Sequence, residues 1–265
     1  LASVKLFFTL HMYNKQRYKL IKIMAEFNMP TEIVELPSKG IVYPEDNPLS
    51  SGKVEIKYMT AKEEDILTNQ SYIEKGIVID KVLKSVIVSK VNYDDIIAGD
   101  KNAIMVAARV LGYGGEYEFF SLDKMHKVDL AEIENKPLKE EYYTKGVNEF
   151  KFTLPFTKTE ITWKLLDGRD EKKIDNELEG LKKLYKDNIP TLSTRLKYII
   201  TSVNEERERK FIRDYVDKAL LARDAKALRK HISEISPDVD LSFFPEGSKT
   251  RRSIPININF FWPEV

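Results

Sequence analysis

The chain has 265 residues, of which 42% are hydrophobic and 32% are charged, which is enough apolar material for the core of one or two folded domains. Forty-three Lys and Arg residues stand against forty-two Asp and Glu residues, so the net charge of +1 gives no overall attraction to nucleic acid or to an anionic membrane. The absence of cysteine excludes a disulfide scaffold, a thiol nucleophile, an iron–sulfur cluster and a Cys-based zinc site, and three scattered histidines argue against a His-rich metal site.

Residues 1–23 form a basic leader or extension with five Lys or Arg residues and no acid, and without it the net charge falls to 38 − 42 = −4. Its apolar stretch Leu6–Leu10 is shorter than the core of a secretory signal, and nothing in it approaches the length of a membrane span. An upstream extension of the reading frame, an appended strand or helix, and a basic helix lying on a membrane surface are all open interpretations. We expect deletion of residues 1–23 to leave the melting temperature unchanged.

An N-terminal α+β module with a Pro-rich arm is predicted over residues 24–135. Residues 30–52 are rich in Pro, Gly and Ser, which indicates a looping arm with a turn at residues 36–40. Alternating side chains predict a strand at residues 53–59, and Thr60 with Glu63 predicts a capping box for a helix over residues 61–69. Further elements are expected as a buried helix over 77–91, a helix over 101–112 with Asp100 as its N-cap, and strands at 116–120 and 127–130.

Residues 135–148 are the best candidate linker, and the C-terminal module is predicted over residues 136–265. It is expected to hold a helical bundle and an aromatic terminal strand. The predicted strands are 149–154, 160–166 and 254–265, and the predicted helices are 168–187, 192–203, 205–222 and 224–233. The fold class is therefore α+β, with short strands and hairpins packed with helices and a C-terminal half that is mainly helical.

A weak internal repeat relates residues 54–67 to residues 161–174 at an offset of 107. Each segment reads as a strand, an N-cap residue (Thr60 or Asp167), and acids that open a helix. A Leu-Pro pair precedes each one. Two related strand–helix modules would explain the match, and so would the capping chemistry that any strand-to-helix junction favours.

No catalytic constellation can be selected from the sequence. The string Gly112–Gly115 follows a predicted helix, which is the wrong order for a phosphate loop, and no G-x-S-x-G elbow is present. His126 with Asp123 and Asp129 is the only arrangement that resembles a metal site. Such a cluster is expected by chance in a chain with 42 Asp and Glu residues. We therefore predict no enzyme activity, no cofactor, no metal and no small-molecule substrate.

Two aromatic segments and one basic segment remain as candidate contact sites. Phe243-Phe244-Pro245 and Phe260-Phe261-Trp262-Pro263 either fold back on the core or dock on a partner. Lys249–Arg252 could contact phosphate, and together with the leader it supports a nucleic-acid-binding alternative.

Three segments, taken in order, resemble the T4-type bacteriophage baseplate hub assembly proteins that share a Leu-Pro-Ser motif. They are residues 35–44 (ELPSKGIVYP), residues 57–67 with the later 75–87, and residues 254–263 (IPININFFWP). The resemblance covers most of residues 30–265. Some relatives carry a Cys-based zinc segment where this chain has Phe119–Lys127 without cysteine, which places any metal in doubt.

The resemblance implies a non-enzymatic assembly factor, a chaperone or scaffold for the central hub of a contractile phage tail baseplate. Its partners would be other baseplate hub proteins, in the cytoplasm of the infected bacterial host or in the virion tail baseplate. The alternatives are a permanent structural subunit of the baseplate or hub, and a nucleic-acid-binding protein; the near-neutral charge disfavours nucleic acid and membrane as partners. Partner contacts are predicted at Leu36, Pro37, Ser38, Gly40, Tyr43, Pro44, Phe260, Phe261, Trp262 and Pro263.

Overall fold

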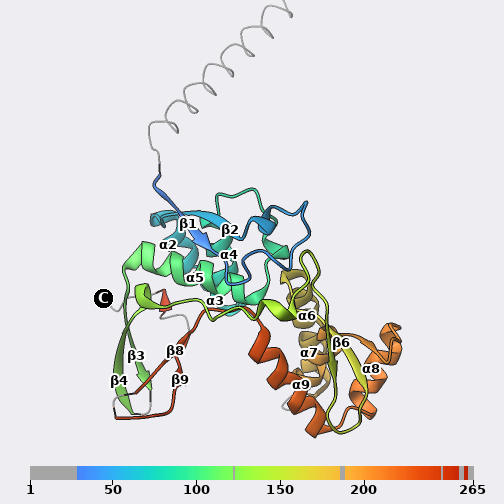
Figure 1. Ribbon diagram of the computed structural model, residues 1–265. Coiled ribbons are helices and arrows are strands. Elements are labelled where there is room, and N and C mark those ends of the chain that lie inside the picture. The colour runs from blue at the N-terminus through green and yellow to red at the C-terminus, as the bar shows by residue number, and fades with distance from the viewer. Residues whose placement is uncertain (1–28, 122, 186–188, 246, 257–259, 262–265) are drawn as a thin grey trace, which may run out of the picture.

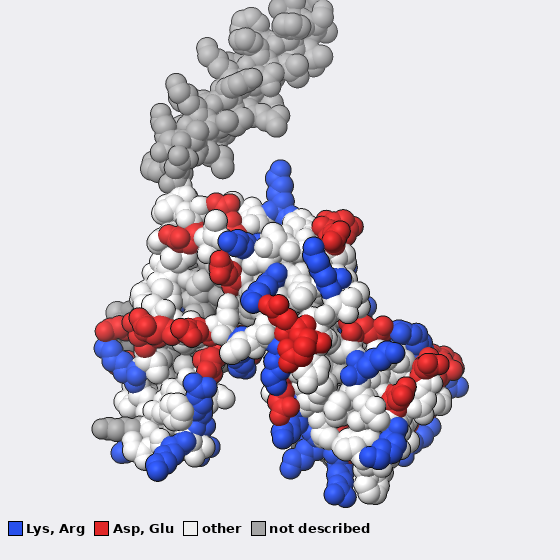
Figure 2. All heavy atoms as spheres, in the orientation of Figure 1, with Lys and Arg blue, Asp and Glu red and all other residues white. Residues whose placement is uncertain are grey.

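The computed structural model describes residues 29–121, 123–185, 189–245, 247–256 and 260–261. The leader at residues 1–23 and the predicted contact residues Trp262 and Pro263 lie outside the described residues. Figure 1 shows an upper part that carries two lobes below it. We call them the hairpin lobe, built on β3, β4, β8 and β9, and the helical lobe, built on β5–β7 and α6–α9. A gap separates the two lobes in the space-filling view of Figure 2.

The α+β class predicted from the sequence is confirmed. The helices are α2 (Ala61–Leu67), α3 (Gln70–Glu74), α4 (Val78–Val86), α5 (Ala98–Tyr113), α6 (Gly168–Tyr185), α7 (Thr191–Ile199), α8 (Arg209–Lys218) and α9 (Ala222–Ile235). The strands are β1 (Thr31–Glu35), β2 (Lys53–Lys57), β3 (Glu116–Ser121), β4 (Lys124–Asp129), β5 (Phe150–Thr153), β6 (Glu160–Trp163), β7 (Ile200–Val203), β8 (Ser242–Phe243) and β9 (Arg252–Ser253). Short 3-10 helices lie at Pro48–Ser51, Tyr93–Asp95, Leu130–Glu132 and Glu140–Tyr142. Within the described residues, no helix has the length and apolarity needed to cross a membrane.

The upper part is a small antiparallel arrangement covered by helices. β1 pairs antiparallel with β2, and the alternation predicted for β2 is confirmed because Val54 and Ile56 are buried while Lys53 is exposed. After α2–α4 the chain returns beside β2, where Ile87 forms an antiparallel bridge with Ile56. α5 packs against both strands, which places its buried face in the core.

The helical lobe contains the three-stranded antiparallel sheet β5-β6-β7. The prediction of one helix over residues 192–203 is wrong in its last turn, because residues 200–203 leave α7 and pair with β6 as β7. Ile200 and Val203 are buried there, and β-branched side chains pack well on a sheet. The predicted helix over 205–222 is shorter as α8, because Asn204 and Glu205 adopt φ values of 47° and 68° in a turn that precedes it.

The hairpin lobe is assembled from both halves of the sequence. β3 and β4 form an antiparallel hairpin, and the β8–β9 hairpin from the C-terminal region packs on it through Phe243 and Phe119, whose ring centroids lie 4.9 Å apart. The last strand of the described chain is β9, whereas the described residues of the range 254–265, where a terminal strand is expected, form no strand. The tail therefore returns to the half of the chain that precedes the predicted linker.

Candidate interaction site

The Leu-Pro-Ser-Lys-Gly segment forms a turn that is held by one buried carboxylate. Asp100, on α5, accepts hydrogen bonds from the backbone N–H of Ser38 (3.0 Å), the Ser38 hydroxyl (2.7 Å) and the Tyr43 hydroxyl (2.6 Å). Asp100 and Ser38 are both fully buried. Asp100 was predicted as the N-cap of this helix; that prediction is wrong, since α5 begins three residues earlier in sequence with Ile97 as its N-cap, and the carboxylate serves the turn instead.

Further contacts fix the turn around Asp100. The Ser38 hydroxyl accepts the backbone N–H of Gly40 (3.0 Å), and the Tyr43 hydroxyl accepts that of Ile97 (3.1 Å). Gly40 has φ = 77°, and a Cβ atom there would lie 2.5 Å from the Ser50 carbonyl oxygen, so only glycine fits. Burial raises the pKa of Asp100, against the lowering effect of its hydrogen bonds, and burial beside Asp100 raises the pKa of Tyr43 above its ordinary value.

A second turn of the same kind occurs at the other Leu-Pro pair, residues 154 and 155. Asp224, the third residue of α9, accepts the backbone N–H of Phe156 (2.9 Å), that of Thr157 (3.0 Å) and the Thr157 hydroxyl (2.8 Å). Asp224 is fully buried, as Asp100 is. Burial alone would raise the pKa of its carboxyl, but these three donors outweigh burial and lower it.

The two turns are similar in backbone conformation, although the hydrogen bond that closes the turn spans three residues in the first and four in the second. Lys39 and Lys158 both have positive φ, 50° and 59°, and the backbone N–H of each donates to the carbonyl of the leucine that starts its turn, at 2.8 and 3.0 Å. Each locking aspartate is the third residue of its helix. We call the two arrangements the first lock (Ser38–Asp100) and the second lock (Thr157–Asp224).

The segments related by the sequence repeat also make equivalent contacts. Lys57 donates to Glu63 (2.9 Å) and Lys164 donates to Asp170 (2.6 Å), and each acid also accepts the backbone N–H of the residue three positions earlier, Thr60 or Asp167. α4 and α7 both end in an extended residue, Ile87 or Ile200, which pairs with the strand that preceded the helices. Each half of the chain therefore has a strand, a capped helix, a residue that returns to pair with that strand, and a locking helix, although α8 precedes the locking helix only in the second half. That these are two related strand–helix modules stays a prediction.

Most of the residues predicted to contact partners are buried inside the folded chain. Leu36, Pro37, Ser38, Gly40 and Tyr43 are buried, whereas Pro44 is exposed. The contacts of Ser38 and Tyr43 with Asp100 are internal to the chain. A direct contact with a partner through these residues stays a prediction, and the described contacts show them shaping the arm.

Phe260 and Phe261, also predicted as contact residues, are fully buried, and their ring centroids lie 5.4 Å apart. The Phe260 ring lies 5.2 Å from that of Tyr117, and its carbonyl accepts a hydrogen bond from Arg109 Nε at 2.6 Å. Arg109 also donates to the carbonyls of Gly114 (2.6 Å) and Glu116 (2.9 Å). The sequence left two interpretations of the aromatic terminus open, folding back on the core or docking on a partner. Phe260 and Phe261 fold back on the core.

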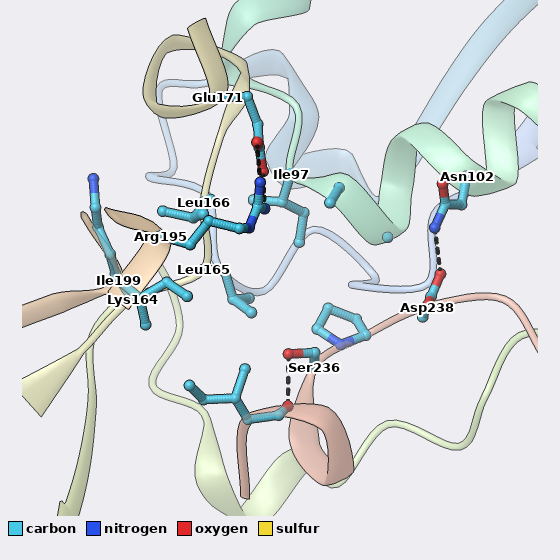
Figure 3. A pocket seen from close by; sticks show the side chains of 14 residues that line it. Ile97, Asn102, Lys164, Leu165, Leu166, Glu171, Arg195, Ile199, Ser236 and Asp238 are labelled. Carbon is cyan, nitrogen blue, oxygen red and sulfur yellow. Dashed lines mark hydrogen bonds and ion pairs between the residues drawn. The ribbon is translucent and has the colours of Figure 1, made fainter. Parts of the chain in front are cut away.

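The two modules meet around a cavity of about 190 Å³, shown in Figure 3. Apolar side chains such as Leu165 line it, and its polar groups are already paired with one another. Arg195 donates two hydrogen bonds to Glu171 (2.8 and 2.6 Å), and Asn102 donates to Asp238 (2.9 Å). These hydrogen bonds satisfy the charged and amide groups around the cavity. The cavity therefore lies at the junction of the modules and offers no unpaired group of these two pairs to a ligand.

The candidate metal cluster of the hairpin loop is not formed. His126 packs against the rings of Phe119 and Phe243, with centroids 5.7 and 4.9 Å away, and its Nε2 lies 3.0 Å from the Ser121 carbonyl oxygen. Over the described part of the chain, no group of three or more His, Asp or Glu side chains is placed to hold a metal ion.

Sequence reasoning missed the three residues that organise this site: Asp100 in its actual role, Asp224 and Arg109. The available signal was the Leu-Pro pair before each repeat, because each pair is followed within three residues by a Ser or Thr whose hydroxyl can donate to an acceptor elsewhere in the chain. Comparison with protein-family models, curated proteins and solved structures finds no match for this chain.

Proposed function

We propose that this chain is a non-enzymatic assembly factor for the central hub of a contractile phage tail baseplate, acting through contacts with other hub proteins in the cytoplasm of the infected bacterium. The observation that carries the proposal is the Leu-Pro-Ser-Lys-Gly segment of the resemblance, whose serine is locked by the buried Asp100. A segment fixed in this way gives the arm a single shape, and a preorganised surface loses less conformational entropy when it binds.

The arrangement of the chemical groups agrees with a binding role. Tyr43 and Tyr93, whose pKa values are raised by burial and by a nearby carboxylate, each donate a hydrogen bond to that aspartate, Asp100 or Asp80. Both contacts tie loops or helices of the first module together. Their perturbed pKa values therefore accompany structural contacts.

The test is a purification of the tagged full-length chain from phage-infected cells, followed by mass spectrometry. We expect tail hub proteins to be enriched over a purification with an unrelated tagged protein of similar size and charge. Recovery of no tail protein would contradict the proposal.

The alternative proposal, a permanent structural subunit of the baseplate or hub, is separated by analysing finished particles. An assembly factor that leaves would be present in infected cells and missing from purified virions, whereas a subunit would be present in both.

A further inference from the structure

The lower ends of both lobes expose an aromatic ring beside an arginine. Phe244, after β8, is 58% exposed, and the Arg251 guanidinium lies 5.1 Å from its ring centroid. Phe156, at the second lock, is also 58% exposed, with the Arg223 guanidinium 5.3 Å from its centroid. Each arginine gains a cation–π contact and covers one face of its ring.

The helical lobe adds a stripe of cations along α9. Arg223, Lys226, Arg229 and Lys230 are all exposed, and their spacing of three and four residues places them on one side of the helix. The acids of α9 offset little of this charge, because Asp224 is buried in the second lock and Glu234 lies 3.6 Å from Lys230 alone. Figure 2 shows Lys and Arg gathered over this helix, next to the gap.

The hairpin lobe separates its charges along its length. At its root, Glu116 and Glu118 flank Lys127, at 2.9 and 3.6 Å. Towards its tip the opposed pair Phe120 and Met125 is exposed, at 63% and 59%. Among the described residues, the exposed cations nearest this end of the lobe are Lys124, Lys249, Arg251 and Arg252. Arg251 contacts Asp240 at 2.8 Å, Asp123 is an exposed acid, and the sequence also has Glu246 between β8 and β9. Figure 2 shows the same change from red at the root to blue at the lower end.

We propose that these two ends act together as a docking surface for an acidic protein segment that also carries aromatic or other apolar side chains. We call it the two-lobe surface: Phe156, Lys226 and Arg229 on the helical lobe, and Phe244, Lys249 and Arg252 on the hairpin lobe. Exposed rings among cations complement carboxylates interleaved with apolar groups. The inference rests on the proposed function in one respect, that the partner is a protein.

Two observations favour an acidic protein over a nucleic acid. An arginine of the chain itself already lies over Phe156 and over Phe244, so the face that a base would stack on is partly occupied. The net charge of +1 also supplies little of the long-range attraction that a polyphosphate partner uses. Short-range contact with a segment that offers both carboxylates and apolar side chains uses every group of the surface.

The test measures binding of the full chain to three fluorescent probes at equal salt: a random Glu-Tyr copolymer, poly-glutamate, and oligo-dT of matched charge. We expect the Glu-Tyr copolymer to bind most tightly. The double variant Lys226→Glu, Arg229→Glu should weaken its binding about tenfold, since each exposed charge contact contributes up to about 1 kcal/mol. The double variant Phe156→Ser, Phe244→Ser should remove the preference for the copolymer over poly-glutamate.

The matched control is Lys62→Glu with Lys75→Glu, which makes the same charge change at exposed positions of α2 and at the end of α3 in the upper part. Its affinity should stay within about twofold of the parent chain. Tighter binding of oligo-dT at matched charge would overturn the inference in favour of nucleic acid. Absence of binding to the copolymer, or equal effects of the two charge reversals, would also overturn it.

The same variants separate this inference from the proposed function. If the parent chain and the Lys226→Glu, Arg229→Glu variant recover the same hub proteins from infected cells, the function stands and the surface is wrong. If the parent binds the copolymer as expected but recovers no tail protein, the surface stands and the function is wrong.

Discussion

Single aspartates decide the conformation of both Leu-Pro turns, although the two carboxylates have opposite pKa shifts. Asp100 receives one backbone N–H and two hydroxyls and also feels the charge of Asp238, so burial dominates and its pKa rises. Asp224 receives two backbone N–H groups and one hydroxyl, and its pKa falls. Each carboxylate receives three donors, and their charged neighbours act in opposite directions: Asp238 raises the pKa of Asp100, whereas Arg223 lowers that of Asp224.

Asp100→Asn is expected to lower the free energy of unfolding by about 2–4 kcal/mol, because an amide replaces one acceptor oxygen with a donor that faces the Ser38 and Tyr43 hydroxyls. Thermal and urea denaturation measure the change. The control Asp46→Asn lies on the exposed part of the same arm and should stay within about 0.5 kcal/mol of the parent. Equal stability of the two variants would show that the first lock does not hold the turn.

We expect Glu63 to contribute to the loss of folding stability at low pH. Burial acts to raise the pKa of its carboxyl, but hydrogen bonds from Ser85, Thr60 and Lys57 outweigh burial and lower the pKa to about 2. A lowered folded-state pKa contributes stability above the unfolded value of 4.5, and that contribution is lost as the pH falls towards 2. Glu63→Gln should therefore destabilise the chain by about 1–2 kcal/mol at pH 7 and by little near pH 2. Urea unfolding across this range checks it, and a difference that does not shrink with acid would contradict it.

At the scale of elements, the sequence correctly predicted those features that depend on interactions between residues close together in the chain. The capping box of Thr60 and Glu63, the alternation in β2 and the Asp167 cap of α6 are all formed within a few residues and were predicted correctly. The helix predicted over residues 192–203 ends early, because its last four residues pair with β6 as β7. Asp100 was placed as a cap because its sequence neighbours suggest one, whereas its partners lie 57–62 residues away.

The junction of the modules depends on the close approach of α5 and the chain after α9. A Cβ atom on Gly99 would lie 1.8 Å from the Pro237 carbonyl oxygen, so Gly99→Ala must push these two segments apart. We expect a loss of about 1–3 kcal/mol, measured by denaturation. Gly180→Ala is the matched control, because nothing lies within 4 Å of its added Cβ on α6. Alanine there should be neutral or stabilise by up to about 1 kcal/mol. Equal effects at the two glycines would contradict the close approach.

At the scale of the whole molecule, the C-terminal region closes the fold over the first half of the chain. Arg109 links α5, the start of β3 and the carbonyl of Phe260, which is 151 residues further along the sequence. No local sequence pattern could reveal this contact. Arg109 lies within an apolar helix and Phe260 within an aromatic tail, and neither position has a feature that indicates a distant partner.

Arg109→Gln is expected to release this closure, because glutamine is too short to reach all three carbonyls that the guanidinium satisfies. Hydrogen exchange should become faster at residues 252–256, and trypsin should cut after Arg251 and Arg252 earlier than in the parent chain. Lys75→Gln, which removes an exposed cation from the upper part, serves as the control and should change neither. Unchanged exchange in the Arg109 variant would show that side-chain packing alone holds the tail.

The spacing of the locks also sets an order of events during synthesis on the ribosome. The partner of Ser38 lies 62 positions later in the sequence and that of Thr157 lies 67 positions later, and the hydrogen bonds of each lock lie within one half of the chain. The first turn can therefore close before the second module is translated. The Phe260–Arg109 contact requires nearly the whole chain. A nascent chain that stalls between residues 100 and 140 would hold the first lock without the contacts that Glu140 and Gly146 later make with the arm, and the two-lobe surface forms only when residues 244–252 have also been made.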